Sequence, residues 1–367
     1  MTPQLAKGII CHSALEEVFD LKPEERSLFS LENLFRREWG RLRGNRDNNA
    51  LGTVEKTEKK TKEEQKYGSL FRKEHNDIDG DGPAPYDIES EIEWGKSAID
   101  LLRNYFIDLE DPRTVKAPNP LMREMWVTAQ FTSGDIDDDT SQFIVKGKID
   151  RIDMLSNSSN DKLQLQIIDY KTGKKPWFKY SKSVNERIKQ EQFWKMKVYA
   201  LLLWKMMQKT DGAKERVAID SKSKKDQWKY GLPWMLQQKL EGIIESGAEG
   251  STPNRFEDVL ELSCLRLAYL TSNLNDESVN DPTTAMADKI TGKATYLDHP
   301  LGSPSEFQSL LEQTDQEVRA IAKNIKTLVD LQDPLAFEHC DWSYCSCHEI
   351  RRRFVHGSVY QCPELDY

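Results

Sequence analysis

The sequence lacks the segments that would place a protein in a membrane or on a secretory route. No apolar run approaches the roughly 18–20 residues that a membrane helix requires, and the longest candidate, 199–204, is flanked by lysines. The opening MTPQLAKGIICHS has neither the long apolar stretch of a secretory signal nor the Arg/Ser-rich character of a transit peptide. We therefore expect an intracellular protein that does not bind a membrane.

Cysteine is scarce and basic charge is not in excess. Six cysteines in 367 residues do not have the density of a secreted disulfide scaffold. With 52 Lys and Arg against 61 Asp and Glu, the net charge of −9 excludes a surface coated in basic charge, although a local basic groove is compatible with it. No GxxxxGK[ST] phosphate loop is present, which excludes a helicase motor within this chain.

The chain alternates between patterned segments and polar insertions, which predicts a single domain over 1–367 with decorations. Residues 44–85 are rich in Asn, Lys, Glu, Gly and Asp, and we predict a disordered or mobile insertion there. A second insertion at 209–260 is partly basic, and 339–367 form a Cys/His-rich tail. In the basic part, Trp228 and Tyr230 would suit nucleic-acid contact, but a solvated loop is the favoured interpretation.

Apolar periodicity predicts an α/β protein. β-rich runs joined by polar turns predict antiparallel strands, and one more strand follows the fourth helix. The predicted helices are 8–20, 31–39, 87–109, 184–208 and 305–331, and the predicted strands are 124–131, 143–155, 163–171 and 262–270.

The candidate chemistry lies in VKGKIDRID (145–153) and IIDYKTGK (167–174). Asp169 and Lys171 are two apart on a predicted strand, so their side chains leave the same face, and Asp150 on the preceding strand can lie beside Asp169. Converging carboxylates suit a hard divalent cation such as Mg²⁺, and a neighbouring lysine can orient an attacking water. The alternative is an exposed, salt-bridged hairpin, which the apolar run before Asp169 disfavours.

GxxDRID followed by an apolar strand and DYKTGK resembles the PD-(D/E)XK nuclease superfamily, in particular its RecB-like exonuclease branch. Three further segments resemble that branch in the expected order. KGIICHSALEEVFDL resembles its Gly-x-x-x-His helix, and FWKMKVYALLLW its Gln-x-x-x-Tyr helix, with Lys195 in place of Gln. LRLAYL and HCDWSYC resemble its later strand and its cysteine-bearing tail.

The resemblance implies a restriction-endonuclease-like core, a central mixed sheet flanked by helices, and Mg²⁺- or Mn²⁺-dependent hydrolysis of DNA. Lys195 keeps a donor for phosphate but lacks the amide acceptor of Gln, and core packing is an equally good explanation of Tyr199. Carried over by position, the metal ligands would be His12, Asp150, Asp169 and the Tyr170 carbonyl, and the catalytic group Asp150, Asp169, Lys171, Lys195 and Tyr199.

The tail departs from the pattern of the branch. Members of the branch hold a 4Fe–4S cluster with one cysteine before the core and three after it. Here the tail spacing differs, Ser343 stands near the usual second tail position, and Cys11 would have to replace the upstream cysteine. A degenerate iron–sulfur cluster, a Zn²⁺ site and free thiols stay open for Cys11, Cys340, Cys345, Cys347 and Cys362.

The function that follows is a metal-dependent DNA exonuclease in repair or recombination, acting on single strands or free ends, alone or beside a helicase or repair partner. The alternative is a catalytically inactive nucleic-acid-binding or scaffold protein with the same fold. The start of the sequence close to the histidine helix adds a third hypothesis, that the chain is part of a longer protein.

Overall fold

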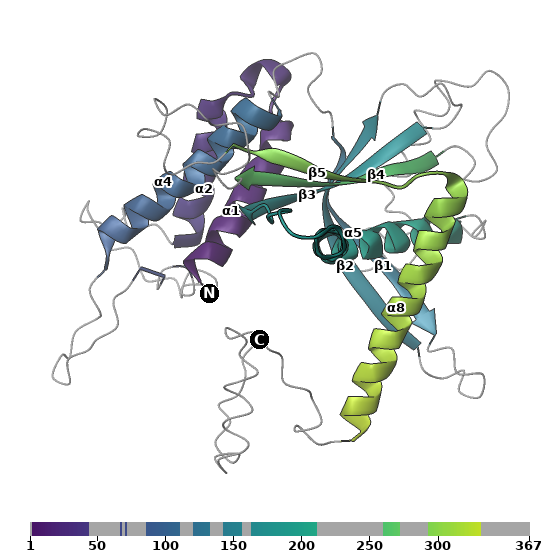
Figure 1. Cartoon of the computed structure of the whole chain (residues 1–367). Helices are drawn as coiled ribbons and strands as arrows, with labels where there is room; N and C mark the ends of the chain where they lie inside the picture. Colours follow the sequence, from purple (N-terminus) through teal and green to yellow (C-terminus); the bar gives the residue numbers. More distant parts are fainter. Residues whose placement is uncertain are drawn as a thin grey trace, which may run out of the picture.

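The computed structural model describes residues 2–43, 67, 70, 71, 86–110, 120–132, 142–155, 163–210, 260–271 and 293–331. Its centre is a five-stranded sheet in the order β1-β2-β3-β4-β5 (Figure 1). β3 and β4 are parallel and the other neighbours are antiparallel, so the sheet is mixed. The strands are β1 Pro120–Thr132, β2 Gln142–Leu155, β3 Leu163–Lys174, β4 Leu260–Thr271 and β5 Thr295–Pro300.

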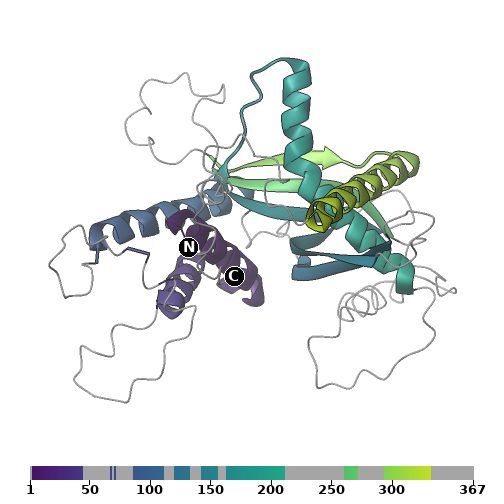
Figure 2. The ribbon, with the colours of Figure 1, turned by 90° about the horizontal axis from the view of Figure 1, so that it is seen from below.

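Helices cover both faces of the sheet. Figures 1 and 2 show α1, α2 and α4 grouped on one side, with α5 and α8 on the other. Among the described residues no helix is both long and apolar enough to cross a membrane. The helices are α1 Pro3–Glu17, α2 Leu28–Arg43, α4 Ile88–Asn104, α5 Lys182–Thr210 and α8 Pro304–Asp330, with short turns η1 Val18–Asp20, η2 Pro23–Glu25 and η4 Tyr105–Leu109.

Strand β3 is buried on both faces, which explains the apolar run before Asp169. Leu165 and Ile167 belong to one apolar cluster, the α5-side core, which also contains side chains of α5, α8, β1 and β2. Ile168 and Tyr170 belong to the other, the α1-side core, with side chains of α1, α2 and α4. Because successive side chains on a strand point to opposite faces, a central strand needs apolar residues at nearly every position.

The predicted central sheet flanked by helices is confirmed, with three differences in detail. β5 was not predicted: it is short and carries polar residues, including the paired Asp298, so its pattern is weak. The last turn of the predicted helix 87–109 is a π-helix. Within 44–85, Tyr67 and Phe71 are buried in the α1-side core.

Candidate metal and catalytic site

The two central carboxylates lie where β2 and β3 part. Pairing of these strands ends at Arg151 and Ile168, so Asp150 and Asp169 occupy the next positions. There the Tyr170 N–H donates to Asp150 Oδ2 at 2.8 Å, so it bonds to a side-chain oxygen and not to a backbone carbonyl of β2. Both carboxylates are buried, Asp150 at 8% and Asp169 at 1% exposed. The two aspartates therefore occupy adjacent positions on β2 and β3, whereas the group of side chains close enough to hold a cation includes Asp150 and not Asp169.

Helix α1 brings His12 to this point. Its Nδ1 lies 3.4 Å from Asp150 Oδ2, and its ring packs edge-on against Tyr170. Burial lowers the pKa of His12, but the hydrogen bond and charge of Asp150 outweigh it, so the pKa is raised. Burial correspondingly raises the pKa of Asp150, and His12 and the Tyr170 N–H bring it below its usual value. The pair is thus a mutually stabilised imidazole and carboxylate.

Glu124 completes a cluster that the sequence analysis did not include. One ligand atom each of His12, Glu124 and Asp150 lies within 4.8 Å of the others. The register pairs Arg123 with Arg151 and Met125 with Ile149, which puts Glu124 opposite Asp150. Its φ of 48° is unusual for a non-glycine residue in a strand. Only the strand register could have revealed Glu124, because no local motif marks it.

Two lysines neutralise Asp169. Lys171 Nζ lies 2.5 Å from Asp169 Oδ2, and Lys195 Nζ donates to Asp169 Oδ1 at 3.0 Å. Burial lowers the pKa of Lys195, but the charge of Asp169 outweighs it and raises the pKa overall. Both ammonium groups keep access to solvent, with 30% and 52% of the side chains exposed. The lysine in the usual place of glutamine therefore reaches the carboxylate centre.

Tyr199 is a buried residue of α5 that packs against Gly147 and lies near Lys195. It is 7% exposed, in the α5-side core, and its ring centroid lies 5.1 Å from Lys195 Nζ. A Cβ at Gly147 would lie 2.8 Å from the Tyr199 Cδ1 and closer still to Cε1. The glycine of the GxxDRID segment is therefore required because the tyrosine ring of α5 occupies the space of its side chain.

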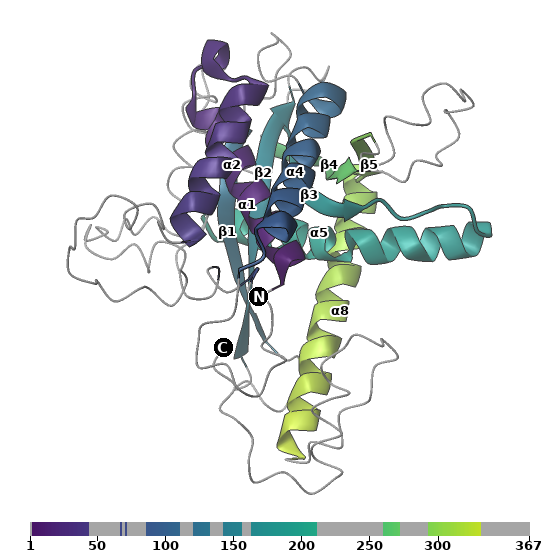
Figure 3. The ribbon, with the colours of Figure 1, turned by 90° about the vertical axis from the view of Figure 1, so that its left-hand side faces the viewer.

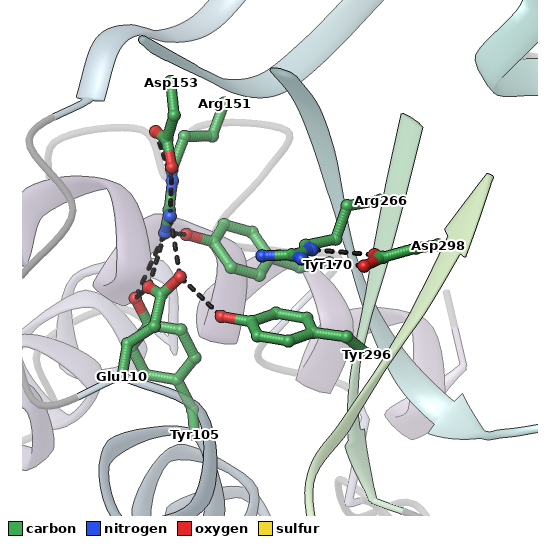
Figure 4. Close-up of polar contacts among 8 residues, drawn as sticks. All are labelled: Tyr105, Glu110, Arg151, Asp153, Tyr170, Arg266, Tyr296 and Asp298. Carbon is green, nitrogen blue, oxygen red and sulfur yellow. Dashed lines mark hydrogen bonds and ion pairs between the residues drawn. The ribbon is translucent and has the colours of Figure 1, made fainter. Parts of the chain in front are cut away.

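Arg151, the residue after Asp150 on β2, is fully buried, and its guanidinium is surrounded by hydrogen-bond partners (Figure 4). It donates to both oxygens of Glu110 at 2.7 Å and to both oxygens of Asp153. It also donates to the Tyr170 hydroxyl at 2.8 Å. Bidentate pairing with two carboxylates fixes the guanidinium geometrically, so the segments around Asp150 and Tyr170 are tied together.

Glu110 connects this arginine to the last strand. The Tyr296 hydroxyl of β5 donates to Glu110 Oε1 at 2.6 Å, and the Tyr105 hydroxyl donates to Oε2 (Figure 4). Burial raises the pKa of Glu110, but Arg151 outweighs it and the pKa is lowered. Next to it, Arg266 pairs with Asp298 and lies over the Tyr296 ring. The network joins η4 and the residue that follows it to β2, β3 and β5.

Cys11 lies in the α1-side core. Its Sγ is 3.9 Å from the Ala98 carbonyl oxygen, and burial raises the pKa of its thiol to about 12, which opposes the thiolate form that binds metals. Three predicted segments lie wholly or mostly outside the described residues. They are the tail with its candidate ligands, the insertion at 44–85 apart from three residues, and most of the insertion at 209–260. The tail residues concerned are Cys340, Cys345, Cys347 and Cys362.

Fold and site together define an α/β protein with a partly buried carboxylate–histidine cluster that could hold a metal ion. Residues 1–350 match the PD-(D/E)XK nuclease superfamily, and the chain belongs to it. No curated protein and no solved structure gave a match. Membership confirms the predicted superfamily and restriction-endonuclease-like core, and it supports a nuclease function with a divalent metal. The RecB-like branch stays a prediction.

Proposed function

We propose that the protein is a Mg²⁺- or Mn²⁺-dependent deoxyribonuclease of the RecB-like branch. It would act as an exonuclease on single strands or free ends during repair or recombination, alone or beside a helicase or repair partner. The observation that carries the proposal is the convergence of His12, Glu124 and Asp150 within 4.8 Å, next to the Asp169–Lys171 pair. A tail cluster of iron–sulfur or zinc type stays a separate hypothesis.

The donor set fits a divalent cation of the harder kind. Carboxylate and carbonyl oxygens suit Mg²⁺ and Mn²⁺, and one imidazole among them favours Mn²⁺ over Mg²⁺. Asp150, Asp169, the Tyr170 carbonyl and His12 would hold the ion, and Glu124 is added to this set. When bound, the cation would supply a water of lowered pKa and neutralise charge at the scissile phosphate.

The chain's own residues would divide the remaining work. Lys171, which lies beside Asp169, would orient the attacking water and stabilise charge on the phosphate. Lys195 would contact the phosphate backbone in the same way from α5. His12 would hold the ion in its neutral form, because only the unprotonated imidazole nitrogen can act as a ligand.

The test is digestion of end-labelled single- and double-stranded DNA with Mg²⁺, Mn²⁺ or EDTA. Asp169→Asn and Lys171→Ala should lower the rate by about 10²- to 10³-fold or more, with a circular dichroism spectrum that shows folded protein at the assay temperature. Lys174→Ala, an exposed lysine on the same strand, is the matched control and should cleave like the wild type. The product ladder separates removal from an end from internal cutting.

One observation favours the inactive alternative. An ammonium group lies at each oxygen of Asp169: Lys195 donates a hydrogen bond to Oδ1, whereas Lys171 lies within ion-pair distance of the buried Oδ2, which has no hydrogen-bond partner among the described residues. Two lysines in this position would substitute for a cation in a protein that binds nucleic acid without cutting it. Folded wild-type protein that binds labelled DNA but cleaves none with either metal would establish this alternative and reject the nuclease.

A further inference from the structure

The outer part of the β1–β2 pair carries an exposed face on the side away from α5. Trp126 and Ile144 are 57% and 58% exposed, whereas Val127 and Phe131 point the other way into the α5-side core. In the register, Trp126 lies opposite Lys148, and Thr128 lies opposite exposed Lys146. Side chains of directly opposed residues share one face of an antiparallel pair. An aromatic side chain and two lysine side chains therefore share this face.

This face is continuous with the candidate metal centre. Glu124 and Asp150 lie two register positions from the Trp126–Lys148 pair on the same two strands, with Met125 and Ile149 between them. Lys148 forms an ion pair with Glu124, which links the two pairs directly. From Asp150 to Lys146 the strand covers about 13 Å at the rise of an extended chain. In Figures 1 and 3 the β1–β2 pair extends beyond α1, so the face leads outward from the centre.

Trp126 differs from the other exposed tryptophans in having no partner of its own. Trp194 on α5 donates its Nε1–H to Glu317, and the Lys179 ammonium lies 3.6 Å from the Trp177 ring centroid. Within the described part of the chain, Trp126 has no hydrogen bond, ring contact or cation–π contact. A large aromatic surface left open beside two cations matches the way single-stranded nucleic acid is held, by base stacking with charge along the backbone.

We infer that the face formed by Trp126, Lys146 and Lys148 is the track on which a single strand of nucleic acid enters the metal centre, with one base stacked on Trp126. The inference rests on the proposed nuclease function. The bases of a duplex are already stacked on one another, so an exposed ring beside the centre selects strands whose bases are free. The track thereby assigns single-strand preference to a particular side chain.

The test measures binding of the full chain to a fluorescein-labelled single-stranded oligonucleotide by anisotropy, in EDTA so that no cleavage occurs. Trp126→Ala should raise the Kd by about 5- to 150-fold, the effect of losing one base stack. Trp126→Phe, which keeps a ring, should lose less. Lys146→Gln should reduce the salt slope of binding by about 0.7, as expected for one phosphate contact on a single strand.

Trp194→Ala is the matched control, and its single-strand Kd should equal that of the wild type. Binding to a blunt duplex of the same sequence should not respond to Trp126→Ala. Wild-type Kd values for Trp126→Ala, an equal loss in Trp194→Ala, or an equal loss on the duplex would each overturn the track.

A second measurement needs no variant. Oligonucleotides with 5-iododeoxyuridine at successive positions should photocross-link to the peptide containing Trp126, and adducts only elsewhere would reject the inference. If the wild type cleaves DNA while Trp126→Ala binds and cleaves normally, the track fails and the nuclease stands. If the wild type neither binds nor cleaves DNA, the proposed function itself fails.

Discussion

Replacement of Arg151 by methionine would leave two buried carboxylates without their partner. Arg151 is 1% exposed, and it pairs with Glu110 and Asp153, whose side chains are each 10% exposed. Breaking a buried pair from one side costs about 3–5 kcal/mol, because the remaining charge stays desolvated and unpaired. Domains of this kind are stable by only about 5–15 kcal/mol. The substitution should therefore remove a large share of the free energy of unfolding.

The chain offers a closely matched control in Arg266. It also binds a carboxylate through two nitrogens, Nε and Nη2, both 2.7 Å from Asp298. Here, however, the arginine and aspartate side chains are 25% and 41% exposed. Solvent screens such a pair, so Arg266→Met should cost about 1 kcal/mol or less. Both arginines pair bidentately with carboxylate, but Arg151 is more deeply buried and holds two carboxylates where Arg266 holds one.

Urea unfolding at pH 7, followed by circular dichroism, measures both variants under one set of conditions. Arg151→Met should lower the free energy of unfolding by at least about 2 kcal/mol more than Arg266→Met, given the two expected costs. If Arg151→Met fails to accumulate as folded protein, the milder Glu110→Gln should still show the larger loss. Equal losses in Arg151→Met and Arg266→Met would refute the argument that burial makes Arg151 decisive.

Three further predictions follow from the same contacts. Gly147→Ala should cost about 1–3 kcal/mol by overpacking against Tyr199, whereas Gly173→Ala, where a Cβ meets nothing within 4 Å, should be tolerated in thermal melts. The lowered pKa of Glu110 stabilises the fold above the unfolded value near 4.5, and this contribution is lost as the pH falls through the folded value; Glu110→Gln should flatten that acid limb in urea titrations. Mn²⁺ at 100 times its Kd should stabilise the fold by about 2.7 kcal/mol. If the same Mn²⁺ concentration raises the free energy of unfolding of Glu124→Gln as much as that of the wild type, Glu124 is not a ligand.

Local patterns were sufficient for most of the architecture. The helices at α1, α5 and α8 and the strands β1 to β4 follow from the periodicity of apolar residues, because the pattern of buried positions depends only on the local repeat. β5 escaped this approach, since its residues are intermediate in burial and one of them pairs with Arg266 across the sheet. The π-helical end of α4 likewise has no signature in the sequence.

Some residues of the candidate site could be predicted from local spacing, and others could not. The positions of Asp150, Asp169 and Lys171 could be predicted because two adjacent strand segments and an i, i+2 spacing bring them together. Lys195 could be placed on a helix, but its contact with Asp169 depends on how α5 crosses the sheet. Glu124 could not be predicted, because its place opposite Asp150 depends on a hairpin register.

What the sequence alone determined is therefore the family, the order of elements and the central carboxylates, all of which are set by short-range spacing. The tertiary structure decided which distant groups complete them. Glu110 and Tyr296 are 186 residues apart, yet the Tyr296 hydroxyl donates to the same carboxylate that Arg151 binds. Such contacts depend on the packing of whole helices and strands against one another, and no local pattern of residue types encodes them.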